Sequence, residues 1–172
     1  GDDCEILLKN ADSAMYHAKE LGRCNHQFFT ESLNVDANRR LEVENALRNA
    51  VQEKQLYLVY QPQICSDTMQ VCGLEALIRW NHPTLGFIGP DQFIPIAEET
   101  RLIIPMGDWV IAEACRQLSE WKRLLVDIPR VAVNISTQQL RSHNLVDTVR
   151  QSMLKYGIQP GELEIEVTES AM

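Results

Sequence analysis

Residues 109–136 read WVIAEACRQLSEWKRLLVDIPRVAVNIS and join a long amphipathic helix to a short apolar strand. Apolar side chains recur at spacings of three and four over residues 105–125, which predicts the helix. RVAVNIS, at residues 130–136, is typical of a strand. The same order is repeated, because residues 144–156 predict a helix and ELEIEVTE at residues 162–169 predicts a strand. Strands that alternate with helices are parallel and joined by right-handed crossovers, so the sequence predicts an α/β fold.

Two strands precede this alternation and are predicted to form a hairpin. They are LYLVYQPQI at residues 56–64 and VCGLEALIRW at residues 71–80. The polar segment CSDTMQ between them suits a turn, so we expect an antiparallel pair. Residues 81–93, NHPTLGFIGPDQF, contain two Pro and two Gly and predict a loop. A short helix is expected next, over residues 91–99.

Residues 1–29 are too few to bury a hydrophobic core of their own. They contain one clear helix, NADSAMYHAKELG at residues 10–22, which Asn10 can cap and Gly22 can end. A strand-like segment, HQFF, follows at residues 26–29. We therefore interpret residues 1–29 as the last piece of an upstream domain.

The next segment is polar and separates this piece from the rest of the chain. Residues 30–38, TESLNVDAN, have no apolar periodicity and predict a linker. An amphipathic helix is predicted over residues 39–53. We place the start of a second domain, residues 39–172, at that helix.

The chain has 172 residues, with 16 Lys and Arg against 24 Asp and Glu, and a formal net charge of −8. This acidic balance argues against a nucleic-acid partner, because non-specific binding depends on Lys and Arg that neutralise phosphates. No apolar run approaches the roughly 18 residues that cross a bilayer, and the first residues, GDDCEILLKN, do not resemble a signal peptide. The five cysteines are odd in number and form no CxxC motif, which favours reduced thiols and a cytoplasmic location. Because the first residue is Gly and not Met, we expect the chain to be cut from a longer protein.

Polar side chains occupy one face of the predicted parallel strands. Side chains alternate along a strand, so Asn134 lies opposite the apolar face of RVAVNIS, and Glu164 and Glu166 lie opposite that of ELEIEVTE. Glu75 lies between apolar neighbours in VCGLEALIRW. A buried carboxylate is unfavourable unless it is paired or binds a metal. Carboxylates and an amide, all oxygen ligands, suit Mg²⁺, Mn²⁺ or Ca²⁺ better than Zn²⁺.

A simpler interpretation stays open for each of these residues. Alternating Glu is common on the solvated face of an antiparallel sheet, and an Asn in a strand is commonly a satisfied polar residue. Arg79 lies on the same face as Glu75 and could hold a phosphate or lie at the surface. Gln61, before Pro62, could be an edge residue. No His is assigned a chemical role.

Five segments resemble the EAL domain family of cyclic-di-GMP phosphodiesterases, in the same order and spacing over residues 41–172. They are LYLVYQPQI, GLEALIRWNHPTLGFIGPDQFIPIAEET, WVIAEACRQLSEW, VAVNIS and LEIEVTES, and Glu75-Ala76-Leu77 is the tripeptide that names the family. Arg101 stands where the family usually has Gly, which we expect to perturb a helix-end turn. The leading segment, NADSAMYHAKELGRCNHQFF, resembles the C-terminal end of a GGDEF (diguanylate cyclase-like) domain, whose active-site loop is not in this sequence.

The resemblance implies a modified TIM-type barrel whose first strand is antiparallel to the others. It implies that Glu75, Asn134 and Glu166 are metal ligands, for two Mg²⁺ or Mn²⁺ ions in the complete domain. The family reaction, part of bacterial second-messenger signalling, is metal-dependent hydrolysis of one phosphodiester bond of cyclic di-GMP to linear pGpG.

The resemblance also implies contacts to the substrate. Gln61 and Arg79 match residues that contact the cyclic dinucleotide. Glu169 matches a glutamate that steadies a loop beside the metals.

A TIM-type barrel has about 250 residues, and the family's Asp-Asp pair, a lysine and a later glutamate come after the position of Met172. Residues 39–172 therefore correspond to the N-terminal half of an EAL domain. We expect this chain to be inactive alone and its open sheet edge to favour self-association. The alternatives are a non-catalytic cyclic-di-GMP-binding or protein-interaction module, and a gene fragment without function.

Overall fold

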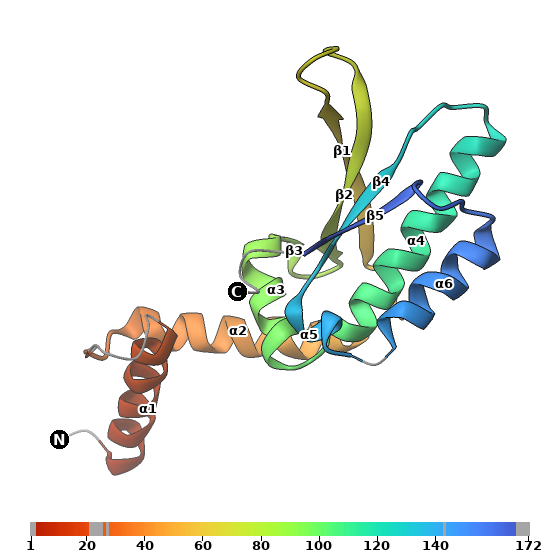
Figure 1. Ribbon diagram of the computed structural model, residues 1–172. Helices are drawn as coiled ribbons and strands as arrows, with labels where there is room; N and C mark the ends of the chain where they lie inside the picture. Colours follow the sequence, from red (N-terminus) through yellow and green to blue (C-terminus); the bar gives the residue numbers. More distant parts are fainter. Residues whose placement is uncertain (1–2, 21–25, 27, 143, 168–172) are drawn as a thin grey trace. The chain divides into compact units, whose positions relative to one another are not determined.

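The computed structural model describes residues 3–20, 26, 28–142 and 144–167. It divides into two units, Gly1–Asn45 and Ala46–Met172. The elements along the chain are α1 (Cys4–Glu20), α2 (Glu31–Ala50), β1 (Leu56–Ile64), β2 (Val71–His82), β3 (Gly86–Ile88), α3 (Pro90–Glu99), α4 (Ile103–Arg123), β4 (Val131–Ile135), α5 (Thr137–Leu140), α6 (Leu145–Tyr156) and β5 (Leu163–Val167) (Figure 1). Among the described helices, none is both long and apolar enough to span a bilayer.

The N-terminal region departs from the sequence-based prediction in two places. α1 begins at Cys4, ahead of the predicted cap at Asn10, and the predicted end of this helix lies outside the described residues. The predicted strand HQFF is wrong, because His26, Phe28 and Phe29 lie outside any strand and residue 27 is not described.

α2 runs without a break through most of the predicted linker. Residues 31–38 are helical, and the helix predicted over residues 39–53 is the C-terminal part of α2, which ends at Ala50. The helix contains no Gly or Pro, so nothing in its polar sequence interrupts the backbone hydrogen bonds. Arg39 and Glu42, about one turn apart, add an ion pair of 3.8 Å between Nη1 and Oε2. The predicted division into domains and linker stays a prediction.

A five-stranded sheet forms the centre of the second unit. β1, β2, β4 and β5 are neighbours in this order, and β3 pairs with β2 outside that path. β1 and β2 form an antiparallel hairpin, from Leu56 opposite Trp80 to Ile64 opposite Val71. β2 pairs with β4, and β4 with β5, in parallel. The predicted hairpin and the predicted parallel strands are confirmed, and the sheet is open, with β1 and β5 at its edges.

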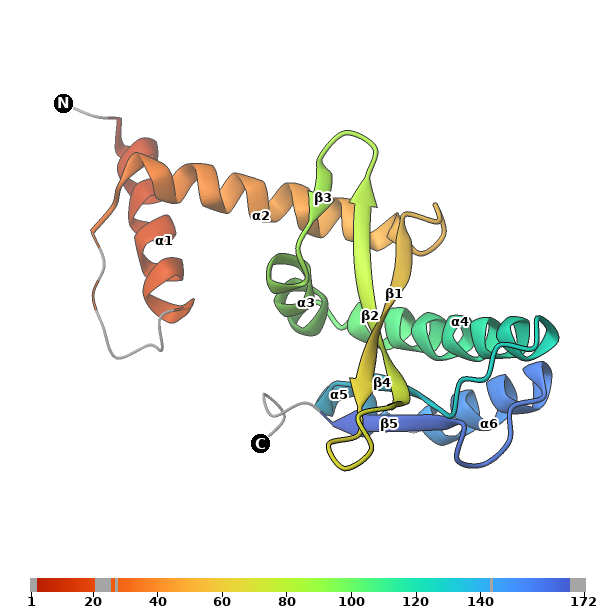
Figure 2. The same cartoon turned by 90° about the horizontal axis from the view of Figure 1, so that it is seen from above.

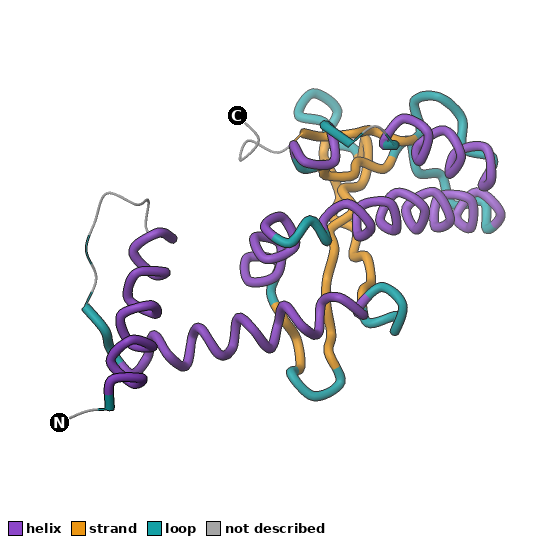
Figure 3. Tube along the Cα trace, turned by 90° about the horizontal axis from the view of Figure 1, so that it is seen from below, coloured by secondary structure: helices purple, strands orange, loops and turns teal. Residues whose placement is uncertain are grey.

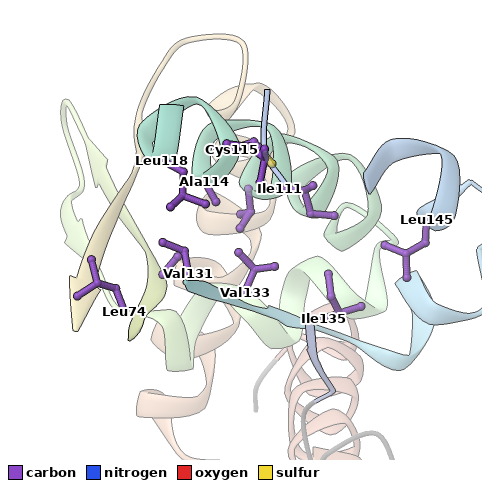
Figure 4. Close-up of a cluster of buried hydrophobic side chains, with 12 residues drawn as sticks. Leu74, Ile111, Ala114, Cys115, Leu118, Val131, Val133, Ile135 and Leu145 are labelled. Atoms are coloured by element: carbon purple, nitrogen blue, oxygen red, sulfur yellow. The ribbon is translucent and has the colours of Figure 1, made fainter. Parts of the chain in front are cut away.

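The hydrophobic core lies between this sheet and two helices, α4 and α6, which pack side by side (Figures 1 and 2). Val131, Val133 and Ile135 of β4 are fully buried there (Figure 4). The other buried members of the cluster are Leu74, Ala76, Val110, Ile111, Ala114, Cys115, Leu118, Leu145 and Ile158. Because alternate residues of a strand point to opposite faces, this packing turns Asn134 away from the helices.

The segment predicted as a loop, residues 81–93, contains a strand. β2 continues to His82, and after a turn β3 pairs with it, with Ile88 opposite Trp80 (Figure 3). Trp80 is fully buried, and its Nε1 donates a hydrogen bond to Gln55 Oε1 at 3.0 Å. Its ring also packs edge-to-face against that of Phe93 in α3, with 5.6 Å between the ring centroids. Gly and Pro in this segment therefore mark turns around a very short strand that a buried tryptophan holds in place.

β5 is covered less well than the other parallel strands. Leu163 packs against the core cluster, but Ile165 and Val167 on the same face are 36% and 50% exposed. Apolar side chains on a parallel strand are usually covered by a helix. This part of the sheet therefore leaves apolar surface open.

Arg101 has φ = +61°, in the left-handed region, in the turn between α3 and α4. This conformation costs a residue other than Gly roughly 1 kcal/mol. We expect Arg101→Gly to raise the melting temperature by about 2–4 °C, which corresponds to about 1 kcal/mol for a chain of this size. The matched control is Arg141→Gly, at φ = −80°, which we expect to lower it. Thermal unfolding followed by circular dichroism measures both, and equal destabilisation by the two changes would contradict the assignment of strain to Arg101.

Candidate functional site

Three polar side chains come together on the face of the sheet opposite the hydrophobic core. Glu75 of β2, Asn134 of β4 and Glu166 of β5 are half-buried. Asn134 pairs in register with Glu166, and its Nδ2 lies 2.7 Å from Glu75 Oε1. The structure thus places these three predicted site residues on three adjacent strands of one face.

The carboxylates on this face differ in how their charge is compensated. Glu164 forms an ion pair with Arg130, whose Nε lies 2.7 Å from Oε2. Within the described part of the chain, no ion pair involves Glu75 or Glu166. Each of these two carboxylates instead accepts an amide hydrogen bond, Glu75 from Asn134 Nδ2 and Glu166 from Gln63 Nε2. A cation bound between them would supply a charge partner that the described residues do not.

The donor set fits a hard divalent cation. Two carboxylates and an amide offer oxygen ligands, which Mg²⁺ and Mn²⁺ prefer. The Asn134 amide points its nitrogen at Glu75, and a half-turn of the amide presents its oxygen instead. No group of three or more His, Cys, Asp or Glu gathers among the described residues, so the third donor here is an amide.

A cavity of about 280 Å³ is lined by Arg79 and, of the three residues above, by Asn134 but not by Glu75 or Glu166. Its wall is mostly apolar and comes from β2, α3 and α4, with Ile94, Ile103 and Met106 among the lining residues. The Arg79 side chain is half-buried, and its Nη1 donates to the carbonyl oxygen of Ile78 at 2.9 Å. This cavity gives the guanidinium and the Asn134 amide a shared space.

Two further residues were predicted to belong to the site, Gln61 and Glu169. Gln61 is exposed on β1, opposite Glu75 in the hairpin register. Glu169 lies outside the described residues, so its predicted role is not addressed by the structure.

Two buried residues that the sequence analysis missed fix the turn after Asn134. Ser136 and Gln139 are 6% and 4% exposed and form a capping box at the start of α5. Ser136 Oγ accepts from the Gln139 backbone N–H at 3.3 Å, and Gln139 Oε1 accepts from the Ser136 N–H at 3.1 Å. The pattern of Ser followed three residues later by Gln is the signal that could have found them.

α4 makes room for this capping box at one position. A Cβ on Gly107 would overlap the side-chain amide of Gln139. Gly107 therefore lets the buried Gln139 side chain pass between α4 and the end of β4.

We expect Gly107→Ala to lower the free energy of unfolding by about 1–3 kcal/mol, because overpacking outweighs the higher helix propensity of Ala. Gln139→Ala in the Gly107→Ala background removes the overlapping amide, so the double variant should be more stable than the sum of the single changes predicts. Urea denaturation of the four proteins of this cycle measures the coupling, and strictly additive changes would contradict it.

Comparison with known proteins identifies the family. Residues 44–172 match the family model of the EAL domain, and the chain therefore belongs to the EAL domain family. It is 44% identical over 164 residues to the bifunctional diguanylate cyclase/cyclic di-GMP phosphodiesterase MucR of Pseudomonas aeruginosa, covering 95% of this chain and 24% of that protein. It is 44% identical over 172 residues to the cyclic di-GMP phosphodiesterase NbdA of the same organism, covering 100% of this chain and 22% of that protein.

Solved structures agree with this assignment. The PaMucR phosphodiesterase in complex with c-di-GMP matches with a TM-score of 0.70 and 42% identity, over 74% of this chain and 52% of that one. The FimX EAL domain of Xanthomonas citri in complex with c-diGMP matches with a TM-score of 0.69 and 26% identity, over 80% and 53%. The chain spans about a quarter of the length of the curated relatives named above.

Proposed function

We propose that this chain is the N-terminal half of a cyclic-di-GMP phosphodiesterase domain, an incomplete TIM-type barrel. The protein that carries it hydrolyses one phosphodiester bond of cyclic di-GMP and gives linear pGpG. The observation that carries the proposal is the pair of half-buried carboxylates, Glu75 and Glu166, gathered around Asn134 without an ion pair in the described chain. The phosphodiesterase activities for which MucR and NbdA are named support the same reaction.

Glu75, Asn134 and Glu166 would hold Mg²⁺ or Mn²⁺, of which the complete domain takes two. When bound, such ions polarise the phosphodiester and lower the pKa of the attacking water. The chain's own contribution is to hold three oxygen donors on adjacent strands. The buried capping box of Ser136 and Gln139 keeps the end of β4, and with it Asn134, in place.

Arg79 and Gln61 would bind the cyclic dinucleotide beside these ligands. A guanidinium makes strong charge-assisted hydrogen bonds to phosphate oxygens, and Arg79 shares a cavity wall with Asn134. The exposed Gln61 amide lies opposite Glu75 in the hairpin. Glu169 would steady a neighbouring loop, and the leading segment would be the end of a GGDEF-like domain.

The proposal concerns the protein that carries this chain, with its later barrel strands present. A TIM-type barrel closes with eight strands, whereas β1, β2, β4 and β5 form an open sheet here. The exposed Ile165 and Val167 of β5 would make the isolated chain prone to self-association.

A non-catalytic cyclic-di-GMP-binding module is the second candidate. The FimX EAL domain and the PaMucR phosphodiesterase were both solved in complex with c-di-GMP, so binding of the dinucleotide is common to both candidates. Binding alone does not require uncompensated carboxylates, because negative charge beside a phosphate repels it. The charges of Glu75 and Glu166 therefore favour hydrolysis.

We expect Glu75→Gln to abolish hydrolysis of cyclic di-GMP by the full-length protein, because it removes a charged metal ligand and keeps the side-chain shape. The matched control is Glu164→Gln on the same face, since Glu164 is already paired with Arg130, and it should retain turnover. Formation of pGpG with Mn²⁺, followed by chromatography, measures both. Unchanged turnover in Glu75→Gln would overturn the ligand assignment.

Arg79→Ala should weaken binding of cyclic di-GMP about tenfold or more, since a hydrogen bond to a charged group contributes about 1.5–3 kcal/mol. Calorimetric titration with cyclic di-GMP measures this change, and titration with Mn²⁺ alone should show no difference from the parent protein. Arg123→Ala, at the exposed end of α4, is the control. A change confined to Mn²⁺ affinity would argue against a substrate contact by Arg79.

A further inference from the structure

One hydrogen bond joins the two edge strands, β1 and β5, across the polar face of the sheet. Gln63 Nε2 of β1 donates to Glu166 Oε1 of β5 at 3.3 Å, although β2 and β4 lie between these two strands. Strands that are not neighbours meet in this way only when the sheet is curled strongly around the face that carries the polar residues.

The hairpin is adapted locally to send the Gln63 side chain in this direction. The register between β1 and β2 is interrupted between Gln63 and Ile64. Gly73 lies opposite Gln63, and a Cβ there would come within 3.0 Å of Gln63 Oε1 and 2.9 Å of Arg130 Cγ. Because Gly73 has no side chain, there is space beside it for the side chains of both Gln63 and Arg130.

The energetics of Gln63 are poor for a residue with a purely structural role. Its Oε1 is buried and has no hydrogen-bond partner among the described residues. Burying an unsatisfied acceptor costs free energy, so an apolar side chain of the same length would pack on this face more favourably. What Gln63 supplies, and an apolar residue would not, is the donor that contacts one oxygen of Glu166.

We propose that Gln63 is a positioning residue that orients the Glu166 carboxylate for the metal. The inference rests on the proposed function, in which Glu166 is a ligand. By donating to Oε1, Gln63 restrains the Glu166 carboxylate, which would then be held ready to bind a cation. Replacing a residue that donates a hydrogen bond to a metal ligand commonly lowers metal affinity about tenfold to a hundredfold.

The test is the variant Gln63→Met in the full-length protein, which keeps a long unbranched side chain and removes the donor. Mn²⁺ affinity in the absence of substrate, measured by electron paramagnetic resonance, should fall about tenfold or more. A positioning role that acts through Glu166 alone predicts an unchanged KM for cyclic di-GMP at saturating Mn²⁺. The control is Gln70→Met in the exposed turn of the same hairpin, which should bind Mn²⁺ as the parent does.

A second variant removes the same donor with a shorter apolar side chain. Gln63→Leu should weaken Mn²⁺ binding in the same way as Gln63→Met, so it decides the question if Gln63→Met does not fold. Mn²⁺ affinity equal to that of the parent in a folded variant would overturn the positioning role. If the parent protein itself does not bind Mn²⁺, the proposed function fails instead, and the two failures are distinguishable.

Discussion

The packing of β4 against α4 is the constraint on which the rest of the site depends. Val131, Val133 and Ile135 are fully buried against the helices, so side-chain alternation forces Asn134 onto the opposite face. Parallel pairing then places Glu166 beside Asn134, and β2 brings Glu75 within 2.7 Å of its amide. One apolar stripe, which is stable because it removes hydrocarbon from water, therefore determines the direction of three polar side chains.

Much of this polar face could be predicted from the sequence, because a pattern of period two needs no tertiary information. Contacts between strands that are not neighbours depend on the curl of the sheet, which tertiary packing sets, and Gln63 was missed for that reason. The capping box of Ser136 and Gln139 had a readable signal in the sequence. The start of α2 was predicted too late, at residue 39, because a polar segment without apolar periodicity was interpreted as a linker, although it contains no Gly or Pro that would interrupt a helix.

The carboxylates on the polar face of the sheet are compensated in two different ways, and under the proposed function the difference separates a structural carboxylate from the metal ligands. Glu164 lies on the same strand face as Glu166, yet it is neutralised by Arg130 at 2.7 Å. Glu166 receives an amide hydrogen bond instead, which orients a carboxylate without cancelling its charge. A sheet that only had to fold would gain from a cation at both positions.

The polar trio of the site is complete although the sheet is still open at β5. Each strand of the parallel region carries its own donor, so the trio of Glu75, Asn134 and Glu166 forms as soon as β2, β4 and β5 are in register. Exclusion of water and a clamp on the phosphodiester need walls on all sides, and β5 still exposes Ile165 and Val167 where a further helix would lie. Under the proposed function, metal binding and catalysis therefore have different structural requirements. Metal binding depends on the register of the strands, whereas catalysis depends on closure of the barrel.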